Sequence, residues 1–216
     1  MENSNETLST IYLPVGMKHT RISPSRGRPR AFDAEKALHR AMKVFWRKGY
    51  LGTSLSDLTN AMGINRPSLY AAFGDKKSLF RKALERYGNG PSGYVGEALR
   101  EPRARAVAER LLQGVVELLS GPQSPRTCMW VRGALSCGDD PLVEEFAAQR
   151  AAGLGQLRTR LKRAIAEGDL PAGSDPDALA LYLATAVYGL TVQASTGATR
   201  EELLKVVPIV LKAWPR

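Results

Sequence analysis

Helix start and stop signals alternate at short intervals over residues 33–76, and no other feature restricts the fold of this chain as strongly. Asp, Ser and Asn cap helix N-termini, whereas Gly favours helix C-termini. The signals come in the order Asp33, Gly49, Ser54, Gly63, Asn65, Gly74 and Asp75. Apolar residues at helical spacing follow each start, so the sequence predicts four helices, the last at 76–87, with only Gly63-Ile64-Asn65 between the second and the third.

Two short helices around so tight a turn form a helix-turn-helix, whose second helix lies in the major groove of DNA. Arg and Ser can donate hydrogen bonds there to bases or phosphates, a Tyr hydroxyl can reach a phosphate, and an Ala methyl can contact a thymine methyl. Lysines at a helix N-terminus favour phosphate. The candidate DNA contacts are Arg66, Ser68, Tyr70, Ala71, Lys76 and Lys77.

The charge of the chain is concentrated at the same end. Of a formal net charge of +10, residues 1–88 hold 16 Lys and Arg against 7 Asp and Glu, whereas residues 89–216 hold 15 against 14. This asymmetry favours nucleic acid as a partner, with a solubilising basic face as the alternative. Residues 1–25 lack periodicity and predict a disordered arm. The basic run that follows, Arg26, Arg28 and Arg30, can lie along phosphates or enter a minor groove.

The segment Gly27–Tyr87 combines several short motifs: Gly-Arg-Pro-Arg at 27–30, Phe45 before Gly49-Tyr50 and Thr53-Ser54, then Asp57, Gly63 and Leu69-Tyr70-x-x-Phe73-x-x-Lys76. In these motifs it resembles the DNA-binding domain of the TetR family of bacterial transcriptional repressors. By that resemblance the DNA contacts fall on Ser54, Ser56, Arg66, Pro67, Ser68, Tyr70, Ala71 and Lys76. The chain departs from the family pattern at Thr59, where a small Ala is usual, and at Ala71-Ala72, where aromatic and His residues are frequent.

The resemblance also implies a larger helical domain that binds a small-molecule effector and dimerises, and release from DNA when the effector binds. A cluster of helix breakers at 88–93 predicts the domain boundary. We therefore expect an all-α chain with a disordered arm at 1–25, a helix-turn-helix domain at 26–88 and an effector-binding and dimerisation domain at 94–216. Helices are expected at about 94–100, 103–119, 126–137, 141–167, 176–195 and 200–213, and Pro208 can split the last of them.

The stretch 176–195 is apolar almost all round, so it must be covered on two sides. With the last helix it fits the four-helix dimer interface of the family, and a two-fold protein matches a palindromic operator. The alternative is the central core helix of a monomer. The candidate dimerisation residues are Leu179, Leu183, Ala186, Val187, Leu190, Leu203, Val207 and Val210.

A helical bundle can hold an effector in a cavity with apolar walls and a few polar groups. The candidate ligand-binding residues are Met129, Trp130, Arg132, Phe146, Tyr182, Tyr188 and Gln193, with plain core packing as the alternative reading of each. Cys128 and Cys137 are nine residues apart, on different faces of one helix, which disfavours a disulfide between them. A redox or electrophile sensor acting through Cys128 and an inert buried thiol both remain open.

Other classes of protein fit the sequence less well. Two Cys and two His, His19 and His39, cannot build a disulfide framework or an obvious zinc site, and no nucleophile has a base at motif spacing, so no enzyme, metal or cofactor is expected. No apolar run reaches the roughly 18 residues of a membrane span, and the N-terminus lacks a secretory signal, which favours a cytoplasmic protein. We predict a ligand-responsive repressor that binds double-stranded operator DNA as a homodimer. A non-specific architectural DNA binder is the alternative.

Overall fold

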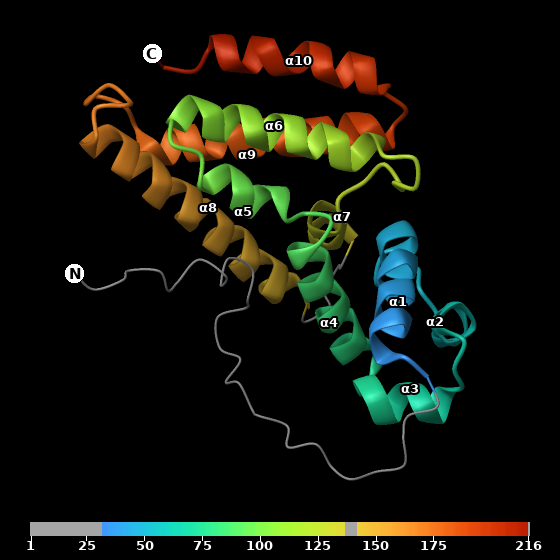
Figure 1. Ribbon diagram of the computed structural model, residues 1–216. Helices are drawn as coiled ribbons and strands as arrows, with labels where there is room; N and C mark the ends of the chain where they lie inside the picture. The colour runs from blue at the N-terminus through green and yellow to red at the C-terminus, as the bar shows by residue number, and fades with distance from the viewer. Residues whose placement is uncertain (1–31, 137–141, 216) are drawn as a thin grey trace, which may run out of the picture.

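The computed structural model describes residues 32–136 and 142–215, and every regular element within them is an α-helix (Figure 1). This confirms the all-α prediction. The helices are α1 (Ala34–Lys48), α2 (Leu55–Met62), α3 (Arg66–Phe73), α4 (Lys76–Asn89), α5 (Tyr94–Leu99), α6 (Ala104–Ser120), α7 (Met129–Ser136), α8 (Leu142–Ala166), α9 (Pro176–Ser195) and α10 (Arg200–Lys212). The predicted arm at 1–25, the arginines at 26, 28 and 30, and Cys137 lie outside the described residues.

Local capping explains where these helices begin. The Asp33 carboxylate accepts hydrogen bonds from the N–H groups of Glu35 and Lys36, at 3.0 and 3.1 Å, and so starts α1. Asp175 starts α9 in the same way, through the N–H groups of the second and third residues that follow it. The predicted helix starts after both aspartates are confirmed.

The last helix differs from the prediction. α10 is continuous from Arg200 to Lys212 with Pro208 inside it, so the expected split is wrong. A proline inside a helix removes one hydrogen bond and costs about 3 kcal/mol. Burial of the apolar face of α10 against α6, including Leu203, Val207 and Leu211, offsets this cost.

One hydrophobic core lies among α5, α6, α8, α9 and α10. α6 packs against α5, α9 and α10, and α9 also packs against α8. In Figure 1, α6 and α9 lie side by side, with α10 on one side of the pair and α8 crossing on the other. Leu112, Leu161 and Leu183 are fully buried in this core.

A second core belongs to α1–α4 but extends beyond them. Phe45 and Phe80 are two of its buried rings, with centroids 4.9 Å apart. Met129 of α7 and Phe146 of α8 are buried in the same cluster. The turn at 90–93 separates α4 from α5 along the chain, within the predicted boundary at 88–93, but the core of the first part crosses that boundary.

By length and composition alone, α9 qualifies as a possible membrane span, with a mean hydropathy of 1.3 and 28% of its apolar window buried. It is the one helix that does so in the described ranges. Its packing against α6, α8 and α10 places one side of it inside the helical bundle. The other side leaves Leu181 and Val192 exposed.

Candidate nucleic-acid interface and effector cavity

The turn between α2 and α3 depends on one glycine and one cap. Gly63 has a φ of 70°, a left-handed conformation that strains residues with a β-carbon, and its N–H donates to the carbonyl of Thr59 at 3.0 Å. The Asn65 side chain accepts from the N–H of Ser68 at 2.9 Å and so starts α3. The predicted helix-turn-helix is confirmed, including both of these residues.

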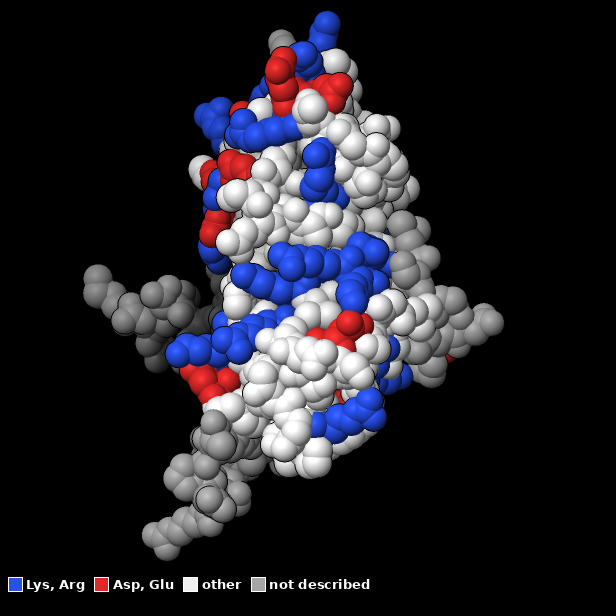
Figure 2. Space-filling view, turned by 90° about the vertical axis from the view of Figure 1, so that its right-hand side faces the viewer, with Lys and Arg blue, Asp and Glu red and all other residues white. Residues whose placement is uncertain are grey.

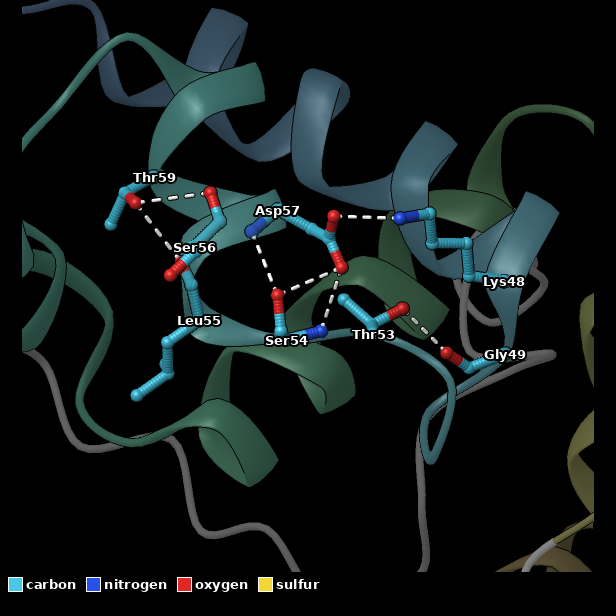
Figure 3. Close-up of polar contacts among 8 residues, drawn as sticks. All are labelled: Lys48, Gly49, Thr53, Ser54, Leu55, Ser56, Asp57 and Thr59. Atoms are coloured by element: carbon cyan, nitrogen blue, oxygen red, sulfur yellow. Dashed lines mark hydrogen bonds and ion pairs between the residues drawn. The ribbon is translucent and has the colours of Figure 1, made fainter.

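A capping box ties the start of α2 to the end of α1 (Figure 3). Ser54 Oγ accepts from the N–H of Asp57 at 3.0 Å, and Asp57 Oδ2 accepts from the N–H of Ser54 at 2.9 Å. Lys48 Nζ donates to Asp57 Oδ1 at 2.6 Å. The bond from Lys48, followed by those from Ser54, lowers the pKa of Asp57 to about 2. A carboxylate that is charged at neutral pH therefore joins α1 to the helix-turn-helix.

Thr59 fills the position where the family usually has a small Ala. Its hydroxyl donates to the carbonyl of Leu55 at 3.0 Å and lies 3.2 Å from that of Ser56 (Figure 3). The hydroxyl is thus satisfied within its own helix, and the departure from the family pattern leaves no polar group without a partner there.

α3 has one buried side and one exposed side. Leu69 is fully buried and Phe73 is 6% exposed, so these two side chains anchor the helix on the core. On the opposite side Tyr70 is 48% exposed, and Arg66 and Ala71 are exposed as well. A helix held by two anchors presents its polar side outward, as reading a DNA groove requires.

The start of α3 also lies against α2. Arg66 Nη2 donates to Ser56 Oγ at 3.3 Å, and both side chains are exposed. Pro67 is exposed in the first turn, Ser68 is half-buried, and Ser54 is exposed at the start of α2. The structure therefore brings Arg66 and Ser56, two of the predicted DNA contacts, together on one surface.

The two lysines at the start of α4 have different surroundings. Lys76 Nζ lies 4.4 Å from the centroid of the Tyr50 ring, in a cation–π contact. Lys77 Nζ lies 3.6 Å from a carboxylate oxygen of Glu145 in α8, and Arg81 forms a bidentate pair with the same carboxylate. Arg81 is the main cause of the lowered pKa of Glu145. Lys77 thus lies between the predicted DNA surface and α8, which sequence reasoning did not anticipate.

Positive charge continues along one side of the molecule. Figure 2 faces the side on which α1, α2 and the loop between α6 and α7 lie, and Lys and Arg form a band across its middle with further cations below. On these elements Arg47, Lys48 and Arg126 are exposed. This side adjoins the helix-turn-helix, in keeping with a polyanionic partner.

A cavity of about 210 Å³ lies among α5–α9. Three predicted ligand residues, Trp130, Phe146 and Tyr188, line it. Trp130 and Phe146 meet edge to face with centroids 6.2 Å apart, and both also line a cavity of about 300 Å³ beside α4. Apart from Trp130 and Tyr188, the polar residues that line the first cavity are Ser92, Tyr94, Cys128, Gln149 and Arg150. Apart from Cys128, these residues carried no sequence signal, because only the packing of α5, α7 and α8 brings them to one cavity.

The other four predicted ligand residues lie elsewhere. Met129 is 2% exposed in the core shared with α1–α4. Arg132 lies against the end of α1, where a β-carbon on Gly49 would be 3.3 Å from its Nε. The Tyr182 hydroxyl donates to the carbonyl of Val210 at 2.9 Å, and Gln193 lines a surface groove between α9 and α10.

Cys128 is 8% exposed and lines the cavity of about 210 Å³. Burial raises the pKa of its thiol, and the thiolate is the reactive form of a cysteine. Its neighbour Tyr87 is fully buried, and burial also raises the pKa of that hydroxyl. The resting environment of Cys128 therefore resembles that of a structural thiol.

The predicted dimerisation residues fall mainly inside the subunit. Five of them, Leu183, Leu190, Leu203, Val207 and Val210, are 9% exposed or less, and Leu179, Ala186 and Val187 are half-buried. Their assignment to an interface stays a prediction, although the side chains of the five buried residues pack in the chain's own core. The large hydrophobic side chains that α9 and α10 leave exposed are Leu181, Tyr188, Val192, Val206 and Ile209. The sequence predicted both helices, but it did not predict which of their apolar side chains are exposed.

Comparison with known proteins identifies relatives along most of the chain. Residues 37–83 match the family model described as bacterial regulatory proteins, tetR family. The chain is 30% identical over 198 residues to the HTH-type transcriptional repressor ComR of Escherichia coli (strain K12), covering 90% of this chain and 94% of the relative. It is 35% identical over 190 residues to the HTH-type transcriptional regulator YezE of Bacillus subtilis (strain 168), covering 86% and 97%.

Solved structures agree with these relatives. A cysteine-substituted variant of the TetR family transcriptional regulator CifR, in complex with 26-base-pair double-stranded operator DNA, matches with a TM-score of 0.81 and 44% identity. The match covers 88% of this chain and 100% of that one. The resemblance predicted from Gly27–Tyr87 is thus confirmed well beyond that segment, and the chain belongs to the TetR family of bacterial regulatory proteins.

Proposed function

We propose that this protein is a transcriptional repressor that binds a palindromic operator as a homodimer and leaves it when a small molecule occupies the cavity among α5–α9. The observation that carries the proposal is the outward side of α3, where Arg66, Tyr70 and Ala71 are exposed while Leu69 and Phe73 are buried. The operator complex of the CifR variant supports it, since that chain shares the fold and 44% of its residues. Such a regulator acts in the cytoplasm.

The DNA contacts divide by chemistry. Arg66 can donate two hydrogen bonds to a guanine edge, with Ser68 beside it, whereas the Tyr70 hydroxyl, Lys76 and Lys77 suit phosphates. Ala71 and Pro67 offer apolar contact, and Ser54 and Ser56 offer hydroxyls at the start of α2. The arginines at 26, 28 and 30 add charge from the N-terminal segment.

Mutation separates base reading from phosphate binding. An operator is first selected from random double-stranded DNA with the wild-type protein, and affinities are measured by fluorescence anisotropy. Arg66→Ala should weaken specific binding by about 1–3 kcal/mol and relax preference at one base pair, whereas Lys76→Ala should weaken all sequences alike. Unchanged sequence preference in Arg66→Ala would contradict the role of Arg66. Equal competition by every DNA sequence would instead identify an architectural binder.

The homodimer rests on the outer faces of α9 and α10. Leu181, Tyr188 and Val192 are seven and four residues apart in turn, so they lie on one side of α9. On α10, Val206 is 40% and Ile209 69% exposed. An exposed apolar face on two adjacent helices fits the same face of a second copy.

Charge substitution tests this interface. Ile209→Glu should shift sedimentation from dimer to monomer and lower operator affinity at least tenfold, with unchanged helical content. Lys162→Glu places the same residue at an exposed position of α8 and should leave both properties unchanged. A dimer that survives Ile209→Glu together with Val192→Glu would refute this interface.

The effector role rests on the cavity. Its walls are apolar, with Arg150 and Gln149 among its few polar groups, so a small apolar compound with one polar group is the ligand that it suits. Compounds that lower operator affinity are sought by anisotropy. Ala184→Trp, which fills the cavity from α9, should keep operator affinity and lose the response; a full response would place the effector elsewhere.

A further inference from the structure

The loop between α6 and α7 lies where the DNA-binding helices meet the rest of the chain. It runs from Gly121 to Cys128 and passes between the end of α1 and the end of α9 (Figure 1). Hydrogen bonds connect it to both helices. The loop therefore links the part of the molecule proposed to bind DNA with a helix proposed to bind the second subunit.

Arg126 makes the link to α9. Its Nε donates to the carbonyl of Ala194 at 3.2 Å, and its Nη2 donates to the carbonyl of Ala198. The carbonyl of Ala194 lies in the last turn of α9, where the helix dipole favours a cation, and that of Ala198 lies in the turn between α9 and α10. One guanidinium therefore binds both the end of α9 and the turn that follows it.

The backbone of Arg126 is strained. Its φ is 59°, and among the residues that the structure describes it is the one non-glycine residue with a positive φ. Its N–H donates to Ser124 Oγ at 3.0 Å. Strained residues persist where their surroundings hold them in place, and they concentrate at functional positions.

The next residues make the link to α1. The carbonyl of Thr127, a residue 6% exposed, accepts from Trp46 Nε1 at 2.6 Å. Lys43 Nζ donates to Gln123 Oε1 at 3.1 Å. Because α1 packs against α2 and α4, a movement of this loop relative to α9 would turn the helix-turn-helix as well.

We infer that Arg126 is a positioning residue for operator recognition, which sets the separation and relative rotation of the two α3 helices in the dimer and thereby the preferred spacing of the half-sites. The inference rests on the proposed function, because α9 must lie in the interface. Half-sites one turn apart are about 34–36 Å and 10–10.5 base pairs apart, so one base pair changes the separation by about 3.4 Å. A small rotation of each DNA-binding part against α9 is therefore enough to change the preferred spacing.

The test varies the spacing between half-sites. An operator is selected with the wild-type protein, and its spacer is lengthened or shortened by one and two base pairs. Arg126→Asn removes the guanidinium but keeps a residue that tolerates the left-handed conformation. Arg105→Asn is the matched control, because Arg105 Nη1 donates to the carbonyl of Leu211 at the end of α10 at 2.8 Å, away from α1.

We expect the wild type and Arg105→Asn to prefer one spacing at least tenfold over its neighbours. Arg126→Asn should discriminate less than threefold while remaining dimeric by sedimentation, and Arg126→Lys, which can reach one carbonyl, should fall between. Trp46→Phe removes the hydrogen bond between α1 and the loop, and it should relax the preference for one half-site spacing in the same way.

If folded Arg126→Asn keeps the wild-type preference for one half-site spacing, the inference about Arg126 is overturned and the proposed function is not. If Arg126→Asn does not fold, wild-type preference retained in both Arg126→Lys and Trp46→Phe overturns it equally. A wild-type protein that is monomeric or selects a single half-site would overturn the proposed function, and the inference with it.

Discussion

Gly133 and Gly155 both lie inside helices, yet replacing each by alanine should change stability in opposite directions. Alanine inside a helix is favoured over glycine by about 1 kcal/mol. At Gly155 of α8 an added β-carbon meets nothing within 4 Å. At Gly133 of α7 it would lie 2.0, 2.4 and 2.7 Å from three atoms of the Phe146 ring.

The clash with the Phe146 ring decides whether Gly133→Ala stabilises or destabilises the protein. The ring would have to retreat by about 1.5 Å to regain ordinary carbon–carbon contact. Phe146 is 4% exposed and its ring packs against Trp130 and Phe80, with centroids 6.2 and 6.1 Å away. Overpacking in such a site costs about 1–3 kcal/mol, and the upper end applies because neighbouring rings hold this one. Subtracting the helix preference leaves a net loss of about 2 kcal/mol.

The stability of both glycine variants is measured by thermal unfolding, followed by far-ultraviolet circular dichroism. At about 2–4 °C per kcal/mol for a chain of this size, Gly133→Ala should melt about 4–8 °C below the wild type and Gly155→Ala about 2–4 °C above it. Protein concentration is kept equal, since dimerisation shifts the midpoint. Two variants that both melt above the wild type would refute the packing of Phe146 against Gly133.

Three further predictions concern the junctions of the DNA-binding helices. The pKa of Asp57 is lowered from 3.8 to about 2 on folding, so its contribution to stability is complete above about pH 4 and is lost as the pH falls toward 2. In urea titrations the difference in free energy of unfolding between wild type and Asp57→Asn should therefore close over that range. A difference that stays constant with pH would contradict the capping box. Ser54→Ala should lower the free energy of unfolding by about 1 kcal/mol and Ser54→Gly by only a few tenths, so equal losses would argue against side-chain capping. Trp46→Phe leaves the buried carbonyl of Thr127 without its donor and should cost about 1–3 kcal/mol in the same titration, a loss that would be absent if the bond were not formed.

The features that the sequence predicted best are those that depend on near neighbours. Asp33, Ser54, Asn65 and Asp75 each cap a helix through N–H groups two or three residues further along, so their effect needs no tertiary structure. The positive φ of Gly63 belongs to the same class. These local rules were enough to locate the helix-turn-helix and the candidate face of α3.

The features that the sequence did not predict depend on packing between distant segments. Glu145 reaches Lys77 only because α8 begins beside α4, and 68 residues separate the two along the chain. On α9, Leu183 and Leu181 are equally apolar in sequence, and only contact with α6 and α8 decides that the first is buried and the second exposed. Pro208 disrupts a helix locally, but the buried face of α10 outweighs it.

The core shared by α1–α4 with α7 and α8 limits how such regulators can be recombined. A chimera joined at the turn 90–93 would remove Met129 and Phe146 from that core and expose the Phe80 ring that packs against Phe146. Grafting α1–α4 onto a different effector domain would therefore transfer operator choice only if the host supplies matching side chains at both positions. The residues that would have to be transferred together are therefore discontinuous in the sequence of this protein, and they include part of the segment that follows α6.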